Sequence, residues 1–299
     1  MMGVDSLNDR FGLAGLRFSE TADGMSIAEV DTPLCVARIA LQGAQVLAWT
    51  PQGEQPVIWL SDEAVFKPGK SLRGGIPVCW PWFGAQPAQP SLPAHGFARN
   101  LSWQVQATEQ LADGRVMLRL RLDNTAIDRK LWSYQSELEL HMCFGTTLEL
   151  ELITRNTGEQ AFIISEALHT YFAVGDVRQV RVLGLEDGDY LDKVLGFTRL
   201  RQQGPVSFSK EVDRIYINNT AQCVIEDSLF GRRIHIDKRG SLSTVVWNPW
   251  QEKAAAMGDM GEDGYLRMLC VETANATPNT VTIDPGEEHR LWAAYRIEH

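Results

Sequence analysis

Polar side chains gather among glycines, prolines and aromatic residues in three segments of the chain. The first, residues 72–84 (LRGGIPVCWPWFG), places Arg73 before two glycines, which let the backbone approach another group closely. Its aromatic residues could form a wall against a sugar ring, because the C–H faces of a sugar are apolar. The alternative is a rigid aromatic corner at the end of a sheet, with Arg73 in an ordinary salt bridge.

The second segment, residues 92–100 (LPAHGFARN), carries His95 and Arg99 and follows the proline-rich stretch 84–93. An arginine presents a planar fork of donors that suits a carboxylate or a phosphate. Arg73 and Arg99 together would therefore form an anion site in an otherwise acidic chain. The alternative is that Arg99 pairs with a nearby aspartate or glutamate. Loops as long as 84–93 are often functional.

The third candidate is a histidine together with a glutamate far along the chain. His169 lies in residues 165–172 (SEALHTYF), at the end of an apolar strand, and Glu272 lies in residues 269–274 (LCVETA). With an ordinary pKa of about 6.5, a histidine can act as an acid or a base near neutral pH. The alternatives are a hydrogen-bonded core histidine and a solvated glutamate at a strand end. Nothing in the sequence alone brings the two residues together.

Composition and charge restrict the class of partner. The chain has 299 residues, with 28 lysines and arginines against 38 aspartates and glutamates, which gives a net charge of −10. This balance argues against nucleic acid and against anionic membranes, because both favour a basic surface. No apolar run reaches the roughly 18 residues of a membrane span, and the first residues lack a signal-peptide pattern. We therefore expect a soluble, acidic protein of the cytoplasm.

The cysteines are scattered and odd in number: Cys35, Cys79, Cys143, Cys223 and Cys270. Each lies in an apolar stretch and none forms a Cys-x-x-Cys pair, so we expect reduced cysteines that pack as small core residues. Their spacings do not indicate a zinc site, and the chain has no phosphate-loop or dinucleotide fingerprint.

Strand patterns dominate the rest of the sequence. Alternation of apolar and polar residues over 115–122, 136–142 and 147–153 is typical of antiparallel strands with one buried face. Further strands are expected at 162–173, 177–184, 214–218, 222–225, 232–237, 242–246, 267–272, 279–283 and 288–297. The best helix candidate is 252–260. About twenty short strands without a domain-scale linker predict an all-β protein, a large two-sheet sandwich that forms a single domain over 1–299.

Five motifs occur in one order along the chain and are specific as a set, although each alone would be weak. They are RGGIPVCWPWFG from residue 73, LPAHGFARN from 92, ALHTYF from 167, VDRIY from 212 and CVETA from 270. With this set the chain resembles the hexose-6-phosphate mutarotase branch of the aldose 1-epimerase family. The resemblance implies a galactose-mutarotase-like β-supersandwich of two large, mostly antiparallel sheets, with a sugar cleft across one sheet.

The resemblance also implies roles for single residues. His169 matches the general acid of the family and Glu272 its general base. His95 matches a second active-site histidine that binds the sugar near its ring oxygen. Asp213 matches an acidic residue that holds a sugar hydroxyl. Arg73 and Arg99 match the arginines that the phosphosugar branch places around the phosphate.

The implied reaction interconverts the α and β anomers of a hexose 6-phosphate, above all glucose 6-phosphate. Opening the ring removes a proton from the C1 hydroxyl and delivers one to the ring oxygen. We expect ionised Glu272 to take the first proton and protonated His169 to supply the second. No metal or cofactor is required for this chemistry, and the resemblance implies a monomer.

Two other functions stay open. A carbohydrate-binding protein without catalysis would use the same aromatic wall and Asp213, but it would need neither His169 nor Glu272. A glycoside-cleaving enzyme would need two carboxylates about 5–10 Å apart around the bond, for which Glu272 and Asp213 could serve.

Overall fold

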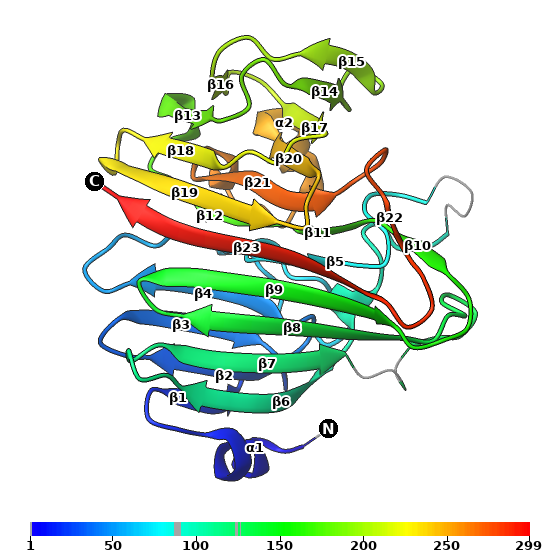
Figure 1. Cartoon of the computed structure of the whole chain (residues 1–299). Helices are drawn as coiled ribbons and strands as arrows, with labels where there is room; N and C mark the ends of the chain where they lie inside the picture. Colours follow the sequence, from blue (N-terminus) through cyan, green and yellow to red (C-terminus); the bar gives the residue numbers. More distant parts are fainter. Residues whose placement is uncertain (1, 87–90, 123–124, 126) are drawn as a thin grey trace.

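Strands are the main elements of the computed structural model, which describes residues 2–86, 91–122, 125 and 127–299 (Figure 1). Within these residues the α-helices are α1 (Val4–Phe11) and α2 (Trp250–Met257), and neither has the length and apolar character that a membrane crossing requires. Short 3-10 turns occur at η1 (Ala98–Asn100), η3 (Val177–Gln179) and η4 (Gly264–Leu266). The prediction of an all-β protein is confirmed.

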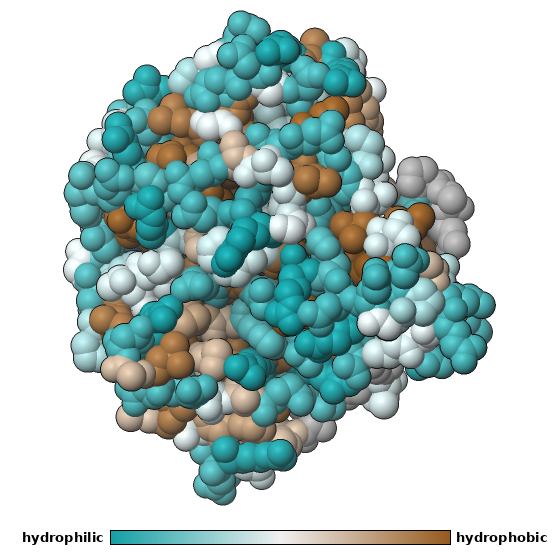
Figure 2. All heavy atoms as spheres, in the orientation of Figure 1, coloured by the Kyte–Doolittle hydropathy of each residue, from teal (hydrophilic) through white to brown (hydrophobic). Residues whose placement is uncertain are grey.

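The largest sheet has nine strands and crosses the whole molecule (Figure 1). Its order is β16 (Val206–Ser207), β13 (Val180–Leu183), β18 (Cys223–Asp227), β19 (Arg232–Arg239), β23 (Glu288–Glu298), β9 (Thr147–Asn156), β8 (Ser136–Phe144), β7 (Val116–Leu122) and β6 (Trp103–Gln110). Every second residue of β8 is buried, because one face of the sheet packs on the core. The surface over this sheet in the same view is mostly hydrophilic, with smaller hydrophobic patches (Figure 2).

A second, eight-stranded antiparallel sheet packs against the first, and Phe172 meets Tyr295 of β23 edge-on at 5.1 Å between ring centroids. Its order is β15 (Thr198–Arg201), β14 (Asp189–Asp192), β17 (Val212–Ile217), β20 (Ser243–Asn248), β21 (Met268–Asn275), β11 (Glu166–Leu168) and β5 (Val78–Cys79), and β12 (Tyr171–Ala173) also pairs with β21. Every residue of β20 and β21 is buried, because both faces of the sheet are covered here.

A four-stranded sheet and a two-stranded sheet complete the fold. The first is β1 (Leu16–Glu20), β2 (Ser26–Asp31), β3 (Cys35–Ala40) and β4 (Gln45–Pro51), and the second is β10 (Phe162–Ile164) with β22 (Val281–Ile283). The expected strands begin at residue 115 and leave out residues 185–213, so β1 to β6, β14 to β16 and α1 are not among the predictions. In β4, burial does not alternate strictly, and a register shift interrupts its pairing with β3.

Several predicted elements have different bounds in the structure; the strand expected over 177–184, for example, is divided into the 3-10 turn η3 and β13. The strand expected over 162–173 is divided into β10, β11 and β12, because β10 pairs with β22 and the His169 N–H donates to the Pro77 carbonyl at 3.0 Å. The helix expected over 252–260 is α2, which ends at Gly258 with a left-handed φ of 73°. Of the proline-rich stretch 84–93, residues 87–90 lie outside the described part of the chain.

The two faces of the eight-stranded sheet have different surroundings. On one face, Val246, Leu269 and Val271 belong to the main core between the large sheets. On the other face, Trp247 and Cys270 belong to a smaller apolar cluster that also includes Ala254 of α2. Alternate residues along one strand therefore point either into the main core or toward the region beneath α2.

Gly96 fixes the position of the loop that carries His95. Its φ is 71°, and a Cβ atom added to it would lie 1.9 Å from the Trp80 carbonyl oxygen. The Phe97 N–H donates to the same oxygen at 3.1 Å. Only glycine fits such a close approach of two backbones.

Replacing Gly96 with alanine should lower the free energy of unfolding by about 3 kcal/mol or more, because backbone strain and a backbone clash add. Gly53→Ala is the matched control, since Gly53 has φ 82° but no atom within 4 Å of an added Cβ. It should cost about 1–2 kcal/mol. Urea unfolding measures both losses, and equal losses would contradict the clash.

Candidate active site

A cavity of about 310 Å³ opens on the face of the eight-stranded sheet beneath α2. It is lined by every residue that the sequence singles out: Arg73, His95, Arg99, His169, Asp213 and Glu272. Its other lining residues are Phe83, Tyr171, Lys193, Val245, Trp247, Lys253 and Met257. A larger hollow of about 530 Å³ beside α1 and β6 has Arg10 as its only charged lining residue among those described. Chemistry rather than size therefore identifies the candidate site.

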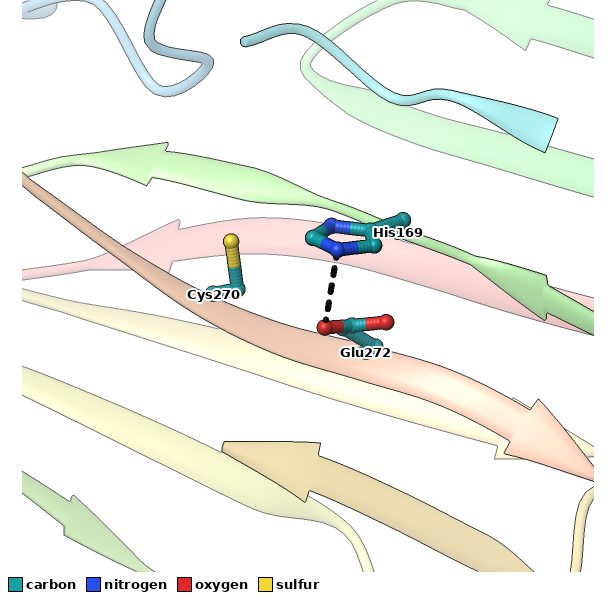
Figure 3. A group of neighbouring side chains, drawn as sticks. All are labelled: His169, Cys270 and Glu272. Carbon is teal, nitrogen blue, oxygen red and sulfur yellow. Dashed lines mark ion pairs between the residues drawn. The ribbon is translucent and has the colours of Figure 1, made fainter. Parts of the chain in front are cut away.

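His169 and Glu272 face each other across neighbouring strands (Figure 3). β11 and β12 pair with β21 in one continuous register, so His169, in the gap between them, lies opposite Glu272. The His169 Nε2 atom lies 3.3 Å from Glu272 Oε1, and Tyr171 stacks on the imidazole with ring centroids 5.0 Å apart. Neither His169 Nδ1 nor Glu272 Oε2 has a partner among the described residues. The sheet thus positions the pair, and these two atoms could still form hydrogen bonds with a ligand.

Burial favours the uncharged form of both members of this pair. It raises the pKa of Glu272 well above its ordinary value, and the negative charge of Asp213 raises it further while Lys193 opposes the shift. Burial also lowers the pKa of His169, with further contributions from His95 and Arg99. The sequence prediction has an ionised glutamate and a protonated histidine, and the two pKa shifts favour instead the form in which one proton has moved from His169 to Glu272.

His95 offers a hydrogen-bond donor to the cavity. The Gly84 N–H donates to its Nδ1 at 3.4 Å, and the Cys79 sulfur lies 3.5 Å from the same atom. Burial lowers the pKa of His95 to about 3, with the positive charge of Arg99 as the next cause. A neutral ring whose Nδ1 accepts must carry its proton on Nε2, which is then the donor.

Asp213, on β17, offers a hydrogen-bond acceptor. Its Oδ2 lies 2.9 Å from Lys193 Nζ, while its Oδ1 is buried with no partner among the described residues. Burial raises the pKa of this carboxyl, and Lys193 opposes the shift. A sugar hydroxyl could donate to the free oxygen.

The two arginines of the cavity differ in their partners. Arg73 Nε donates to Asp259 Oδ1 at 3.0 Å, and Arg73 Nη1 donates to the Tyr171 hydroxyl at 3.1 Å. Arg99 donates to the Ala94 carbonyl at 2.8 Å, and its buried Nε has no partner in the described part of the chain. The structure thus gives Arg73 a salt bridge, whereas the carboxylate partner considered for Arg99 is absent among the described residues.

The predicted aromatic wall is only partly correct. Trp80 is fully buried and packs edge-on against Phe97 and Trp132, so it belongs to a rigid core corner. The glycines after Arg73 approach the protein's own backbone: a Cβ on Gly75 would lie 2.3 Å from the Val46 carbonyl oxygen. These features match the alternative interpretation of residues 72–84 rather than a sugar wall.

Several cavity residues are not among the sequence predictions. Trp247 and Tyr171 provide aromatic surface beside Phe83, and their rings meet at 5.9 Å between centroids. Tyr171 lies in a quoted motif, which was the available signal. Lys193 follows β14 and Lys253 lies on α2, and no motif surrounds either lysine.

One group in the described residues could hold a metal ion. His169, Cys270 and Glu272 each offer a ligand atom, and these atoms lie within 4.8 Å of one another (Figure 3). Nitrogen, sulfur and oxygen ligands of this kind suit a zinc-class ion. An ion bound to His169 Nε2 and Glu272 Oε1 would replace the contact between these two atoms. The same two groups can instead exchange protons with a ligand, which requires no metal.

Comparisons with known proteins give one consistent result. The family model described as "Aldose 1-epimerase" matches residues 27–296. A protein of Salmonella typhimurium named "Putative glucose-6-phosphate 1-epimerase" is 43% identical over 256 residues, which cover 85% of each chain. A protein of Escherichia coli with the same name is also 43% identical over 256 residues, with 85% of each chain covered.

Solved structures share the fold. The crystal structure of a "putative mutarotase" from Salmonella typhimurium superposes with a TM-score of 0.89 at 38% identity, covering 95% of this chain and 94% of that one. A galactose mutarotase-like protein from Clostridium acetobutylicum gives a TM-score of 0.69 at 15% identity, with 95% and 98% covered. The expected galactose-mutarotase-like β-supersandwich is therefore confirmed.

His95 should make stability depend on pH in a defined direction. Its pKa falls from 6.5 when unfolded to about 3 when folded, so below pH 6.5 only the unfolded state takes up the proton. Relative to His95→Asn, the wild type should lose roughly 1.4 kcal/mol per pH unit as the pH falls from 6.5 toward 3. Asparagine suits this position because it tolerates the φ of 64°. Urea unfolding across this range measures the difference, and parallel curves would contradict it.

Proposed function

We propose that this chain, which belongs to the aldose 1-epimerase family, interconverts the α and β anomers of a hexose 6-phosphate, most directly glucose 6-phosphate. The observation that carries the proposal is the contact between His169 and Glu272 at 3.3 Å inside a cavity that also holds Arg99 without a carboxylate partner among the described residues. The names of the relatives from Salmonella typhimurium and Escherichia coli support the same substrate.

The two proton transfers of ring opening involve atoms that lie close together. The C1 hydroxyl oxygen and the ring oxygen are bonded to the same carbon. Two groups 3.3 Å apart can therefore reach both oxygens of one sugar without moving far. Glu272 accepts the hydroxyl proton while His169 donates to the ring oxygen, the bond between C1 and the ring oxygen breaks, and an aldehyde forms.

Closure reverses these transfers on the other face of the aldehyde. After rotation about the C1–C2 bond, Glu272 returns its proton to the carbonyl oxygen and His169 takes the proton of the attacking C5 hydroxyl. The pair holds one proton throughout and exchanges it with the sugar. Neutral Glu272 with neutral His169 is the state that accompanies the open sugar, and burial favours this state. Each transfer group contributes roughly 10²–10⁴-fold to the rate.

The remaining cavity residues bind and orient the substrate in this proposal. His95 Nε2–H donates to a sugar oxygen, and the free Oδ1 of Asp213 accepts from a hydroxyl. Arg99 and Arg73 hold the phosphate, and an arginine whose buried Nε lacks a partner is suited to a phosphate oxygen. Binding at both ends of the sugar places C1 at the proton-transfer pair.

The alternative functions have less support. A binding protein without catalysis needs no buried acid–base pair, whose desolvation is unfavourable to the fold. A glycoside-cleaving enzyme would use two carboxylates, but the group in contact with Glu272 is an imidazole. As further proposals, the chain forms a single domain over 1–299 and acts as a monomer, because one copy supplies every site residue. It works in the cytoplasm, because its five free cysteines suit a reducing compartment.

Glu272→Gln and His169→Asn should fold but interconvert glucose 6-phosphate anomers at least about 100-fold more slowly, because each removes one proton-transfer group. Exchange NMR between the anomeric protons measures the rate. The matched controls are Glu139→Gln and His141→Asn, which change a His–Glu pair 2.9 Å apart on β8. These controls should keep the wild-type rate. Near-normal turnover of a site variant would remove that residue from the mechanism.

Arg73→Ala and Arg99→Ala should each lower kcat/KM for glucose 6-phosphate by about tenfold or more, because a charge-assisted hydrogen bond is lost. Activity on free glucose should change much less. The control is Arg17→Ala, which removes an exposed arginine paired with Glu29 on another sheet. Equal losses on both sugars would mean that the two arginines are structural.

A further inference from the structure

The two arginines of the cavity, Arg73 and Arg99, form what we call the anion end, and they differ in how far other side chains neutralise their charge. Arg73 carries a full counter-ion, because its Nε donates to Asp259 Oδ1 at 3.0 Å. Arg99 donates to one carbonyl, and no carboxylate partners it among the described residues. A phosphate that approaches both arginines therefore meets one guanidinium with no carboxylate partner among the described residues and one that a carboxylate already contacts.

Asp259 cannot easily move away from Arg73, because its neighbours fix the segment. Gly258 ends α2 in a left-handed conformation, and Met260 is buried in the apolar cluster with Trp59 and Tyr171. The segment thus holds the carboxylate beside the guanidinium of Arg73. The side chains of Arg73 and Asp259 are 24% and 34% exposed, so water screens their attraction only in part.

The contact with Asp259 uses one edge of the arginine. Bidentate binding of a phosphate takes two adjacent N–H groups of the guanidinium. Asp259 occupies Nε, and the Tyr171 hydroxyl accepts from Nη1. A phosphate that takes the fork containing Nε must displace the carboxylate, and one that binds elsewhere on Arg73 still lies near its negative charge.

We propose that Asp259 is a specificity-determining residue, a resident counter-ion that competes with phosphate for Arg73 and keeps the anion end weak toward any phosphate group alone. The inference rests on the proposed function for the identity of the substrate. A ligand must then add contacts from its sugar to the pair, to His95 and to Asp213 before it is held well. Inorganic phosphate lacks these contacts, so it binds poorly and does not block the cavity.

The test is calorimetric titration of the full chain with inorganic phosphate. Asp259→Asn keeps the shape of the side chain and removes its charge, so it should bind phosphate roughly three- to tenfold more tightly than the wild type. Asp259→Glu keeps the charge and should bind like the wild type. Glu29→Gln removes one negative charge from a pair with Arg17 on another sheet, and it should also bind like the wild type.

Unchanged or weaker phosphate binding by Asp259→Asn would overturn the inference, because it would mean that the carboxylate only orders Arg73. An equal gain in Glu29→Gln would overturn it too, since net charge rather than the local contact would then be the cause. The proposed function fails separately, if the wild type does not speed anomer exchange of glucose 6-phosphate. In the kinetic assay, inorganic phosphate should inhibit Asp259→Asn at a lower concentration than it inhibits the wild type.

Discussion

A carboxyl group and an imidazole lie 3.3 Å apart in a buried cavity because one strand register holds them there. Glu272 lies in β21, in which every residue is buried. His169 lies in the gap between β11 and β12, which pair with β21 in one register. Desolvation favours the uncharged form of both groups. The pair then carries one proton that it can exchange with a ligand. In the proposed reaction this arrangement suits ring opening and closing, since the two protons are transferred at the C1 hydroxyl oxygen and the ring oxygen, which share one carbon in the closed sugar.

The rest of the fold maintains the pair and supplies the contacts around it. The eight-stranded sheet directs alternate residues to the main core and to the cavity, so packing of the core also sets the positions of Trp247 and Glu272. Gly96 allows the loop of His95 to lie against Trp80, and α2 covers the cavity with Lys253 and Met257. In our proposal, Arg73 and Arg99 hold an anion in the cavity, and Asp259, which pairs with Arg73, sets how strongly it is held.

The sequence identifies the reactive residues of this protein better than it identifies the strands and contacts that surround them. His169, Glu272 and Arg99 stand out because their motifs combine reactive side chains with glycines and aromatics, and all three line the cavity. Strands with strict alternation, such as β8, were predictable from their period, whereas β4, whose burial does not alternate strictly, was not among the predictions. Lys193 and Asp259 carry no local signal: their importance depends on which residues the sheet and the segment after α2 bring beside them.

The central claim is that one sugar ring engages His169 and Glu272 together. A crystal structure with glucose 6-phosphate bound tests it most directly. We expect the C1 hydroxyl and the ring oxygen to lie within about 3 Å of the two side chains, with the phosphate against Arg99 and Arg73. A sugar bound with C1 away from this pair, or a phosphate sugar bound outside the cavity, would contradict the account.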